Sequence, residues 1–503
     1  MSEPDFSRPR RQAPRAVIIL FGENLRRMVQ VVAALVFATL YMEELPISKP
    51  WLIALGAIIL AVFTFIQYSR FRFHVTKEEL ILEKGVLIRE RLSIPLDRIQ
   101  TVHLSQNLIQ QIFQVTGLKI DTAGSGKEEL KISALTHKDA KALQEILQKE
   151  NSVTAIKGDT ETIKQEGLTK EKRDVLVRLN LSRLILVGLT ENHIRSGLIA
   201  VGVLWGYYFQ LKDVFQGDLA EQTHFDPNEW EQALYMARPG IRWILLLILF
   251  FLIASVLVSM FRTILRYFNL EASIGMKSLS VSSGLLKRNA YSIPLNKIQI
   301  MTWRWNLLRG IAGFESVIIK QSKSEESSRN QKVEIPACFK EQTMLIETRL
   351  FGEEAEKEMF EYHPHPYYQI LLSIIFGLIG IVPAGILYVN SKSILVFLIY
   401  AMYLMVMVFW VRQYVKRMKI STNGDLLKYE KGWLFRDRSM LKVYKIQAVK
   451  YTQSLFQKRR GTAHLTIYTA GGSLRIPFLP AKLACEMYSY FLYRVELNVK
   501  SWM

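Results

Sequence analysis

The amino-acid sequence predicts an α+β integral membrane protein with six transmembrane helices in three hairpins, each followed by a small β-barrel or sandwich with a C-terminal helix. Two observations lead to this prediction. A short motif recurs at one fixed spacing, from Gly85 to Gln100, from Gly284 to Gln299 and from Gly432 to Gln447. A pair of long apolar segments precedes each copy of the motif. The chain therefore reads as three copies of one unit.

Composition and charge separate lipid-facing segments from aqueous domains. Half of the 503 residues are hydrophobic, yet 22% are charged, so sizeable water-exposed domains must alternate with the apolar segments. The formal net charge is +20. Such an excess suits either nucleic acid or the anionic inner leaflet of a membrane, and the apolar segments favour the leaflet. Only Cys338 and Cys485 occur, without a CxxC pattern, which excludes a disulfide framework and favours a reducing cytosol around the soluble parts.

The apolar segments set the number of expected spans. Crossing ~30 Å of hydrocarbon takes roughly 20 helical residues. Residues 179–189 are apolar too, but Glu191 and Arg195 follow closely, so we expect an interfacial amphipathic segment there. The three predicted pairs of spans are residues 28–42 with 51–68, 197–211 with 240–261, and 367–389 with 393–411.

Basic residues at the span ends predict the orientation. Arg26 precedes the first span, Arg70 follows the second, Arg262 follows the fourth and Arg412 follows the sixth. The loop over residues 212–238 is rich in acids. Because loops with excess Lys and Arg stay in the cytoplasm, we expect both termini and all three repeat domains to lie inside.

Within the repeat, apolar residues alternate as they do in half-buried strands. Leu80 and Leu82 stand five and three positions before the shared Gly, which itself suits a hairpin turn that needs positive φ. Later strands carry Leu118 and Ile120, and an amphipathic helix closes each copy. We interpret the repeat signature as structural, with the Gln amide satisfying buried backbone groups at a strand bend. Its members are Gly85, Arg98, Gln100, Gly284, Lys297, Gln299, Gly432, Lys445 and Gln447.

At these residues a family resemblance emerges. The string over residues 93–100, then Gln106-Asn107-Leu108, then Thr122-Ala123-Gly124, resembles the bacterial pleckstrin-homology-like (bPH2) domain, and three such domains behind hairpins resemble the YdbT-type membrane proteins of Gram-positive bacteria. The resemblance implies a PH-like β-barrel with a C-terminal helix and residence in the bacterial plasma membrane. The first copy departs from the pattern at Gln114, where the family places Gly, and the second copy lacks Thr-Ala-Gly.

The repeat and the spans together give a map of the chain. Each PH-like domain directly follows its hairpin, and two linkers separate the units. The predicted segments are a basic cytoplasmic tail (1–24), hairpin 1 (25–69), PH-like domain 1 (70–150), a linker (151–178), an interfacial segment with hairpin 2 (179–262), PH-like domain 2 (263–352), a linker (353–366), hairpin 3 (367–412) and PH-like domain 3 (413–503).

The best binding candidates are basic residues of one loop. Lys458, Arg459 and Arg460 lie there in the third copy, and Arg309 lies in the matching loop of the second. A domain tethered beside the inner leaflet would present such a loop to phosphate headgroups or to a partner. An ordinary solvated basic turn explains the same residues equally well.

Catalytic and metal-binding patterns are not evident. Residues 124–127 fail the phosphate-loop pattern, because Asp121 stands where the first Gly belongs and Glu128 where Ser or Thr belongs. His363 and His365 lack a third ligand at suitable spacing, and Pro364 and Pro366 beside them favour a rigid linker. We therefore expect no enzyme activity, no metal and no cofactor.

The architecture predicts a non-enzymatic plasma-membrane protein that presents three PH-like domains as protein- or lipid-docking modules, in membrane scaffolding, assembly or envelope stress. The expected partners are anionic inner-leaflet lipids and other membrane proteins, a smaller PH-like hairpin protein among them, and not nucleic acid. The alternative is a component of a transport or export complex, since Pro383 and nearby glycines are candidates to break the fifth span.

Overall fold

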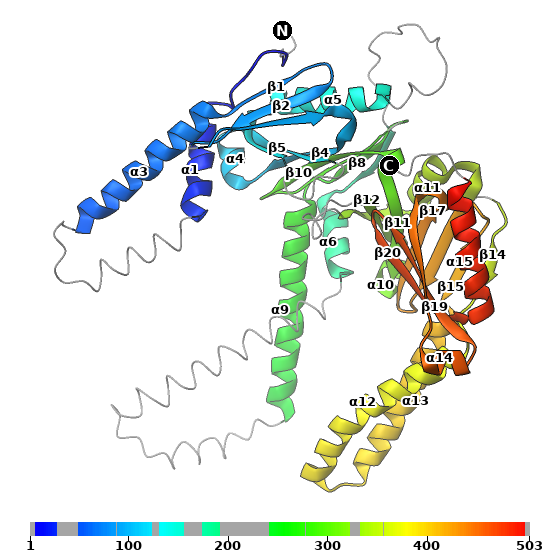
Figure 1. Cartoon of the computed structure of the whole chain (residues 1–503). Helices are drawn as coiled ribbons and strands as arrows, with labels where there is room; N and C mark the ends of the chain where they lie inside the picture. The colour runs from blue at the N-terminus through cyan, green and yellow to red at the C-terminus, as the bar shows by residue number, and fades with distance from the viewer. Residues whose placement is uncertain are drawn as a thin grey trace, which may run out of the picture.

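The computed structural model describes residues 6–27, 49–86, 88–122, 130–154, 174–191, 241–276, 278–321, 332–355 and 357–497. It contains three β-rich lobes, and the long helices leave them toward the lower side of Figure 1. We define lobe 1 as residues 72–154, lobe 2 as residues 271–355 and lobe 3 as residues 419–497. Each lobe has six strands, a short helix after the fourth strand and a terminal helix.

The elements of the three lobes correspond one to one. Lobe 1 comprises β1 (Arg72–Val75), β2 (Glu79–Lys84), β3 (Glu90–Pro95), β4 (Ile99–Gln106), α4 (Leu108–Ile112), β5 (Val115–Thr122), β6 (Leu130–Thr136) and α5 (His137–Thr154). Lobe 2 comprises β8 (Glu271–Ile274), β9 (Ser278–Ser283), β10 (Arg288–Pro294), β11 (Ile298–Asn306), α10 (Leu307–Ile311), β12 (Phe314–Gln321), β13 (Lys332–Phe339) and α11 (Lys340–Phe351). Lobe 3 comprises β15 (Lys419–Thr422), β16 (Leu426–Lys431), β17 (Phe435–Lys442), β18 (Ile446–Thr452), α14 (Leu455–Arg459), β19 (Thr462–Thr469), β20 (Gly472–Pro480) and α15 (Ala481–Glu496).

The repeated glycine closes the hairpin between the second and third strands of each lobe. Gly85, Gly284 and Gly432 have φ values of +114°, +114° and +97°. A Cβ atom on these residues would lie 1.9, 2.0 and 1.8 Å from a backbone carbonyl oxygen of the same turn. Only glycine fits this backbone, which explains why all three copies carry it.

Each lobe encloses a core. The core of lobe 2 also includes residues of β7 (Asp174–Arg178), α6 (Leu181–Leu189) and α9 (Ile241–Tyr267), together with Leu426 and Met440 of lobe 3. In lobe 1 the alternating Leu80 and Leu82 of β2 are buried against Leu118 and Ile120 of β5. The core of lobe 3 takes one residue from lobe 2, Ile300. The period of two in the sequence therefore identified the faces that the strands bury.

The sheets also run from one lobe into the next. One seven-stranded sheet has the order β6-β5-β4-β10-β9-β8-β7, and a second has the order β13-β12-β11-β17-β16-β15-β14. Strand β4 of lobe 1 thus pairs with β10 of lobe 2, and β11 of lobe 2 pairs with β17 of lobe 3 (Figure 1). We call these two antiparallel pairings the junctions. The three domains therefore share sheets, and at the second junction lobes 2 and 3 also exchange core residues.

Segments upstream of the long helices cover the outer edge of each lobe. Residues near Arg10 pair with β1, with hydrogen bonds in both directions between the backbones of Arg10 and Phe73. β7 (Asp174–Arg178) covers β8, and β14 (Phe360–Tyr362) covers β15. The residues predicted as a basic tail, from residue 6 on, and the ends of both predicted linkers are therefore built into the folded units. The reason is that an unpaired sheet edge takes up any nearby extended segment.

Helices follow these edge segments. They are α1 (Ala16–Arg27), α3 (Lys49–Arg70), α6 (Leu181–Leu189), α9 (Ile241–Tyr267), α12 (Tyr367–Ser391) and α13 (Leu395–Lys416). Among the described residues, three stretches are long and apolar enough to cross a membrane, namely Leu249–Tyr267, Tyr367–Val389 and Leu395–Lys416, and Ala54–Arg70 is a shorter apolar stretch. The predicted spans at residues 28–42 and 197–211 lie outside the described residues.

Helices α12 and α13 pack side by side. The Tyr400 hydroxyl donates to the carbonyl of Gly377 at 2.9 Å, and the rings of Phe376 and Trp410 meet edge to face. Helix α12 runs without interruption from Tyr367 to Ser391 and contains Pro383 in its interior. Pro383, a candidate in the sequence for a break of the fifth span, does not end the helix, which continues past the lost backbone donor.

Candidate membrane-contact site

A short helix follows the fourth strand of every lobe, and its first turn fixes its orientation. In lobe 1 the Asn107 side chain accepts from the backbone N–H of Gln110 at 2.8 Å, and the Gln110 side chain accepts in return from the N–H of Asn107. Ser454 and Gln457 form the same reciprocal cap in lobe 3. This capping box satisfies free backbone donors and turns the Gln inward, so that Gln110 and Gln457 are buried.

The opposite face of each short helix presents large apolar residues to the solvent. In α14, Leu455 is 81% exposed and Phe456 is 74% exposed. We call these exposed faces the apolar tips. Three apolar tips with two or three large residues each form a recurring surface feature that folding alone does not require. Their other members are Leu108, Ile109 and Ile112 in α4 and Leu307, Leu308 and Ile311 in α10.

Cationic side chains connect the apolar tips of lobes 1 and 3 to the start of a neighbouring helix. Arg15, just before α1, donates to the carbonyl of Phe113 at the end of α4, at 3.1 Å. The guanidinium of Arg460 lies over the ring of Tyr367, the first residue of α12, at 5.2 Å. Figure 1 accordingly places α4 beside α1 and α14 where α12 and α13 enter lobe 3. The apolar tips of lobes 1 and 3 therefore lie near the starts of α1 and α12.

The predicted binding residues fall into two groups. Lys458, Arg459 and Arg460 are exposed at the end of α14. Arg309 is 2% exposed, and its guanidinium pairs with the carboxylate of Glu191 at 3.1 Å. Its place in the fold differs from the exposed loop that the sequence predicted, because Glu191, just after α6, brings a carboxylate from far along the chain to meet it. Arg309 is thus the lobe 2 counterpart of the cations that join the tips to the helices.

Part of the repeat signature lies at the junctions. The Nζ atom of Lys445 donates to the carbonyls of Asn296 and Ile298 in lobe 2, at 2.6 and 2.5 Å, and Lys445 is buried. Gln299 is buried at the same junction, where a Cβ on Gly471 of lobe 3 would lie 2.8 Å from its Cβ. The other signature cations, Lys297 and Arg98, are half-buried and exposed. Gln447 is exposed, and the side chain of Gln100 lies outside the described residues.

The buried Lys445 makes junction stability depend on pH. Burial, and then the nearby Lys442 and Lys297, lower the pKa of Lys445 to about 8. Between pH 8 and its ordinary value of 10.5 the unfolded chain binds the proton that the folded chain releases, so stability rises with pH, by at most about 3 kcal/mol. We expect thermal unfolding of the detergent-solubilised protein to shift upward from pH 7.5 to 10. The shift should be smaller in Lys445→Met, and an unchanged pH profile in that variant contradicts the assignment.

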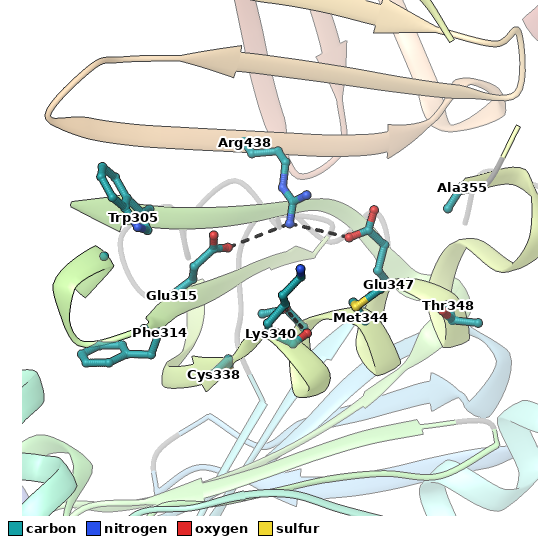
Figure 2. A pocket seen from close by; sticks show the side chains of 13 residues that line it. Trp305, Phe314, Glu315, Cys338, Lys340, Met344, Glu347, Thr348, Ala355 and Arg438 are labelled. Atoms are coloured by element: carbon teal, nitrogen blue, oxygen red, sulfur yellow. Dashed lines mark hydrogen bonds and ion pairs between the residues drawn. The ribbon is translucent and has the colours of Figure 1, made fainter. Parts of the chain in front are cut away.

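Two cavities lie against the second seven-stranded sheet. The first, of about 540 Å³, contains Arg438, whose guanidinium reaches the carboxylates of Glu315 at 3.9 Å and Glu347 at 3.6 Å (Figure 2). Cys338 at its rim is fully buried, and burial raises the pKa of its thiol to about 12, so it is a poor nucleophile. The second cavity, of about 630 Å³, is lined by Lys416, Arg436 and other charged residues.

Metal ligation finds little support among the described residues. They contain no group of three His, Cys, Asp or Glu side chains that could hold a metal ion. The Nδ1 atom of His363 lies 3.1 Å from the carbonyl oxygen of Met418, and His365 accepts from the backbone N–H of Tyr367. Both residues thus fasten the start of α12 to lobe 3, in keeping with the predicted rigid linker.

Comparison with known proteins agrees with the threefold architecture. The chain is 26% identical over 471 residues to the UPF0699 transmembrane protein YdbT of Bacillus subtilis (strain 168), which covers 90% of this chain and 91% of that protein. The family model described as the bacterial PH domain matches residues 25–151, 233–353 and 373–495. Each match includes a helical segment together with its lobe. This chain is therefore a transmembrane protein of the bacterial PH domain family, and it carries that domain three times.

Proposed function

We propose that this protein is a non-enzymatic scaffold of the bacterial plasma membrane, which docks its three PH-like lobes on the anionic cytoplasmic leaflet through the apolar tips. The observation that supports this proposal most is the placement of the tips of lobes 1 and 3 beside the starts of α1 and α12, with the lobe 2 tip beside the end of α6. In this proposal the chain crosses the membrane six times, with both termini and all lobes in the cytoplasm. The basic residues at the span ends favour that orientation.

Lobe 3 has the strongest lipid contact in this proposal. Insertion of Leu455 and Phe456 into the acyl boundary removes two large apolar side chains from water, worth about 1.5 kcal/mol or more each when burial is complete. Lys458, Arg459 and Arg460 add roughly 1 kcal/mol each beside anionic headgroups. A contact of this size is weak for a free domain, but tethering by the adjacent helices raises its effective concentration. The lobes would then contact the leaflet through their apolar tips and present their opposite faces to other proteins.

The transport alternative has less support. It drew on Pro383 and nearby glycines as candidates to break the fifth span, and α12 continues through Pro383. An enzymatic role lacks a candidate nucleophile and base within hydrogen-bond reach in the two cavities, where the charged groups pair with one another as Arg438 does with Glu315 and Glu347. The scaffold proposal uses features found in all three lobes, whereas each cavity occurs at one junction.

The docking of α14 is testable by its depth in the membrane. An environment-sensitive fluorophore on Phe456→Cys, in a Cys485→Ser background and reconstituted in phosphatidylglycerol-rich vesicles, is expected to show a blue-shifted emission. Spin-labelled lipids should quench it. The matched control is Leu497→Cys, which is 57% exposed at the far end of α15. That helix starts at the end of α14 and carries its last residue about 24 Å away.

Charge and apolar variants separate the two parts of this contact. Lys458→Glu with Arg459→Glu should reduce quenching in anionic vesicles, and Leu455→Asp should reduce it in neutral ones too. Because these side chains are exposed, we expect stability to change by no more than about 0.5 kcal/mol. Equal emission from the labels at positions 456 and 497 contradicts the proposal.

A further inference from the structure

The two ends of the lobe array carry strands whose counterparts are paired at the junctions. Strand β3 corresponds to β10 and β17, and β18 corresponds to β4 and β11. In the described part of the chain, β3 pairs only with β2, and β18 pairs only with β19. Each junction pairs the fourth strand of one lobe with the third strand of the next. Lobe 1 therefore carries a third strand, and lobe 3 a fourth strand, that form no junction within the described part of the chain.

The two existing junctions use one register. At the first, Val102 lies opposite Ser292, and these residues stand two after and seven before the signature Gln of their repeats. At the second, Met301 lies opposite Met440, at the same two positions. The same rule places Val449 of β18 opposite Ser93 of β3, and Tyr451 opposite Arg91. A register repeated at both junctions is a property of the repeat and extends to the free ends.

Side chains at the free ends match this register. At the second junction the guanidinium of Arg438 lies 4.6 Å from the ring centre of Trp303, its cross-strand partner. The corresponding residues at the free ends are Arg91 and Tyr451, again a cation and an aromatic ring. Glu90 would lie diagonally across from Lys450, which provides an attractive charge pair.

The signature cation supports the same conclusion. Lys445 reaches across the second junction to the backbone carbonyls of Asn296 and Ile298, which flank Lys297, the signature cation of lobe 2. Arg98, in the corresponding position of lobe 1, is exposed. In the extended register it would reach the carbonyls of Tyr444 and Ile446. Lobe 1 thus carries a cation at the signature position although no other lobe of the described chain pairs with β3. This cation indicates that β3 pairs with another molecule.

Strand β18 is more exposed to solvent than its counterpart β11, as expected for a strand that is ready to pair. Gln299 and Ile300 of β11 are 2% and 0% exposed at the junction. The equivalent Gln447 and Ala448 of β18 are exposed, as are Glu90 and Arg91 of β3. An open sheet edge of this kind is a template for strand pairing that monomeric proteins usually cover. N-terminal residues, β7 and β14 pair with β1, β8 and β15, whereas no strand of the described part of the chain pairs with the outer side of β3 or β18.

We infer that β18 of one copy of this chain pairs antiparallel with β3 of a second copy, in the register of the internal junctions. The occupant is a second copy, because both halves of the junction are present on each chain. Such a contact is heterologous, so it builds open rows or closed rings of lobes along the membrane. The apolar helices of neighbouring lobes leave the array on one side, so copies joined in this way can share one membrane (Figure 1). This self-assembly goes beyond the proposed lipid docking and does not depend on it.

Disulfide trapping between two differently tagged full-length copies tests the inference. One copy carries Ser93→Cys and the other Val449→Cys, both in a Cys485→Ser background, and both are expressed in one membrane. Cys338 stays, because it is fully buried. Mild oxidation is expected to link the two tags in most of the protein, since cross-strand partners lie within disulfide reach. A chain with both substitutions should give a ladder of multimers.

Three controls make the outcome specific. Each single variant alone should stay monomeric on a non-reducing gel, because a head-to-tail contact never brings two equal positions together. Lys450→Cys opposite Ser93→Cys should not link, because one residue of shift points the thiols to opposite faces. The variant Arg98→Glu should reduce the linked fraction at least fivefold. Absence of the mixed link, a link within a single-variant population, or trapping of a different protein on β3 overturns the inference. The depth of the fluorophore at position 456 is measured separately, so failure of one result leaves the other intact.

Discussion

Replacing Trp303 by Ala is expected to lower the opening free energy of lobe 2 by about 3–5 kcal/mol, the usual cost of truncating a buried aromatic residue. Trp303 is 1% exposed in β11, and its ring lies 6.4 Å from that of Phe351 in the core. Its other contact is the guanidinium of Arg438 in lobe 3. One side chain therefore supports both the core of lobe 2 and the second junction, and its loss should loosen both.

Amide hydrogen exchange in β12 measures this effect, because those amides report the opening of lobe 2 itself. The matched control is Trp303→Phe. It keeps the aromatic face for Arg438 and removes an indole N–H that has no acceptor among the described residues. We expect this variant to cost about 1.5 kcal/mol or less. Equal protection in the Ala and Phe variants would show that the ring does not support the fold.

Replacing Gly432 by Ala should destabilise lobe 3 by about 3 kcal/mol, at the upper end of the range for strained backbone. Gly432 has a φ of +97°, and an added Cβ would lie 1.8 Å from the carbonyl oxygen of Phe435. The turn must therefore open. Because β17 forms the lobe 3 half of the second junction, the register with β11 should loosen as well. Exchange at β16 and β17 amides is the measurement.

Gly461 provides the control for this second prediction. Its φ is +62°, but a Cβ there would meet nothing within 4 Å. Gly461→Ala therefore has the conformational cost without the clash, and we expect about 1 kcal/mol. A cost for Gly432→Ala no larger than that for Gly461→Ala would contradict the argument that close approach of the backbone selects glycine in this turn.

The repeat and its strands could be predicted because they depend on side-chain patterns. Alternation of Leu80 and Leu82 marks a buried face, and a Gly in each turn marks positive φ. The capping box at Asn107 and Gln110 was also present in the sequence, and attention to it would have predicted the apolar tips. The basic residues at positions 458 to 460 were found from sequence because they adjoin each other.

Contacts between segments that are distant in the chain could not be predicted from the sequence. The burial of Arg309 depends on Glu191, which lies 118 positions away, just after α6. The edge strands at Arg10, β7 and β14 come from segments predicted as a tail or linkers, because short pairings by backbone groups need no special side chains.

By itself, the sequence determined a membrane protein with three copies of one β-rich domain, since hydropathy and periodicity are properties of neighbouring residues. Only the tertiary structure decided that the domains share their sheets and leave a matching edge at each end of the array. The physical reason is that strand pairing uses the backbone donors and acceptors that every residue carries. Which edges meet is therefore fixed by how the lobes are placed in space, and no local pattern of side chains records it.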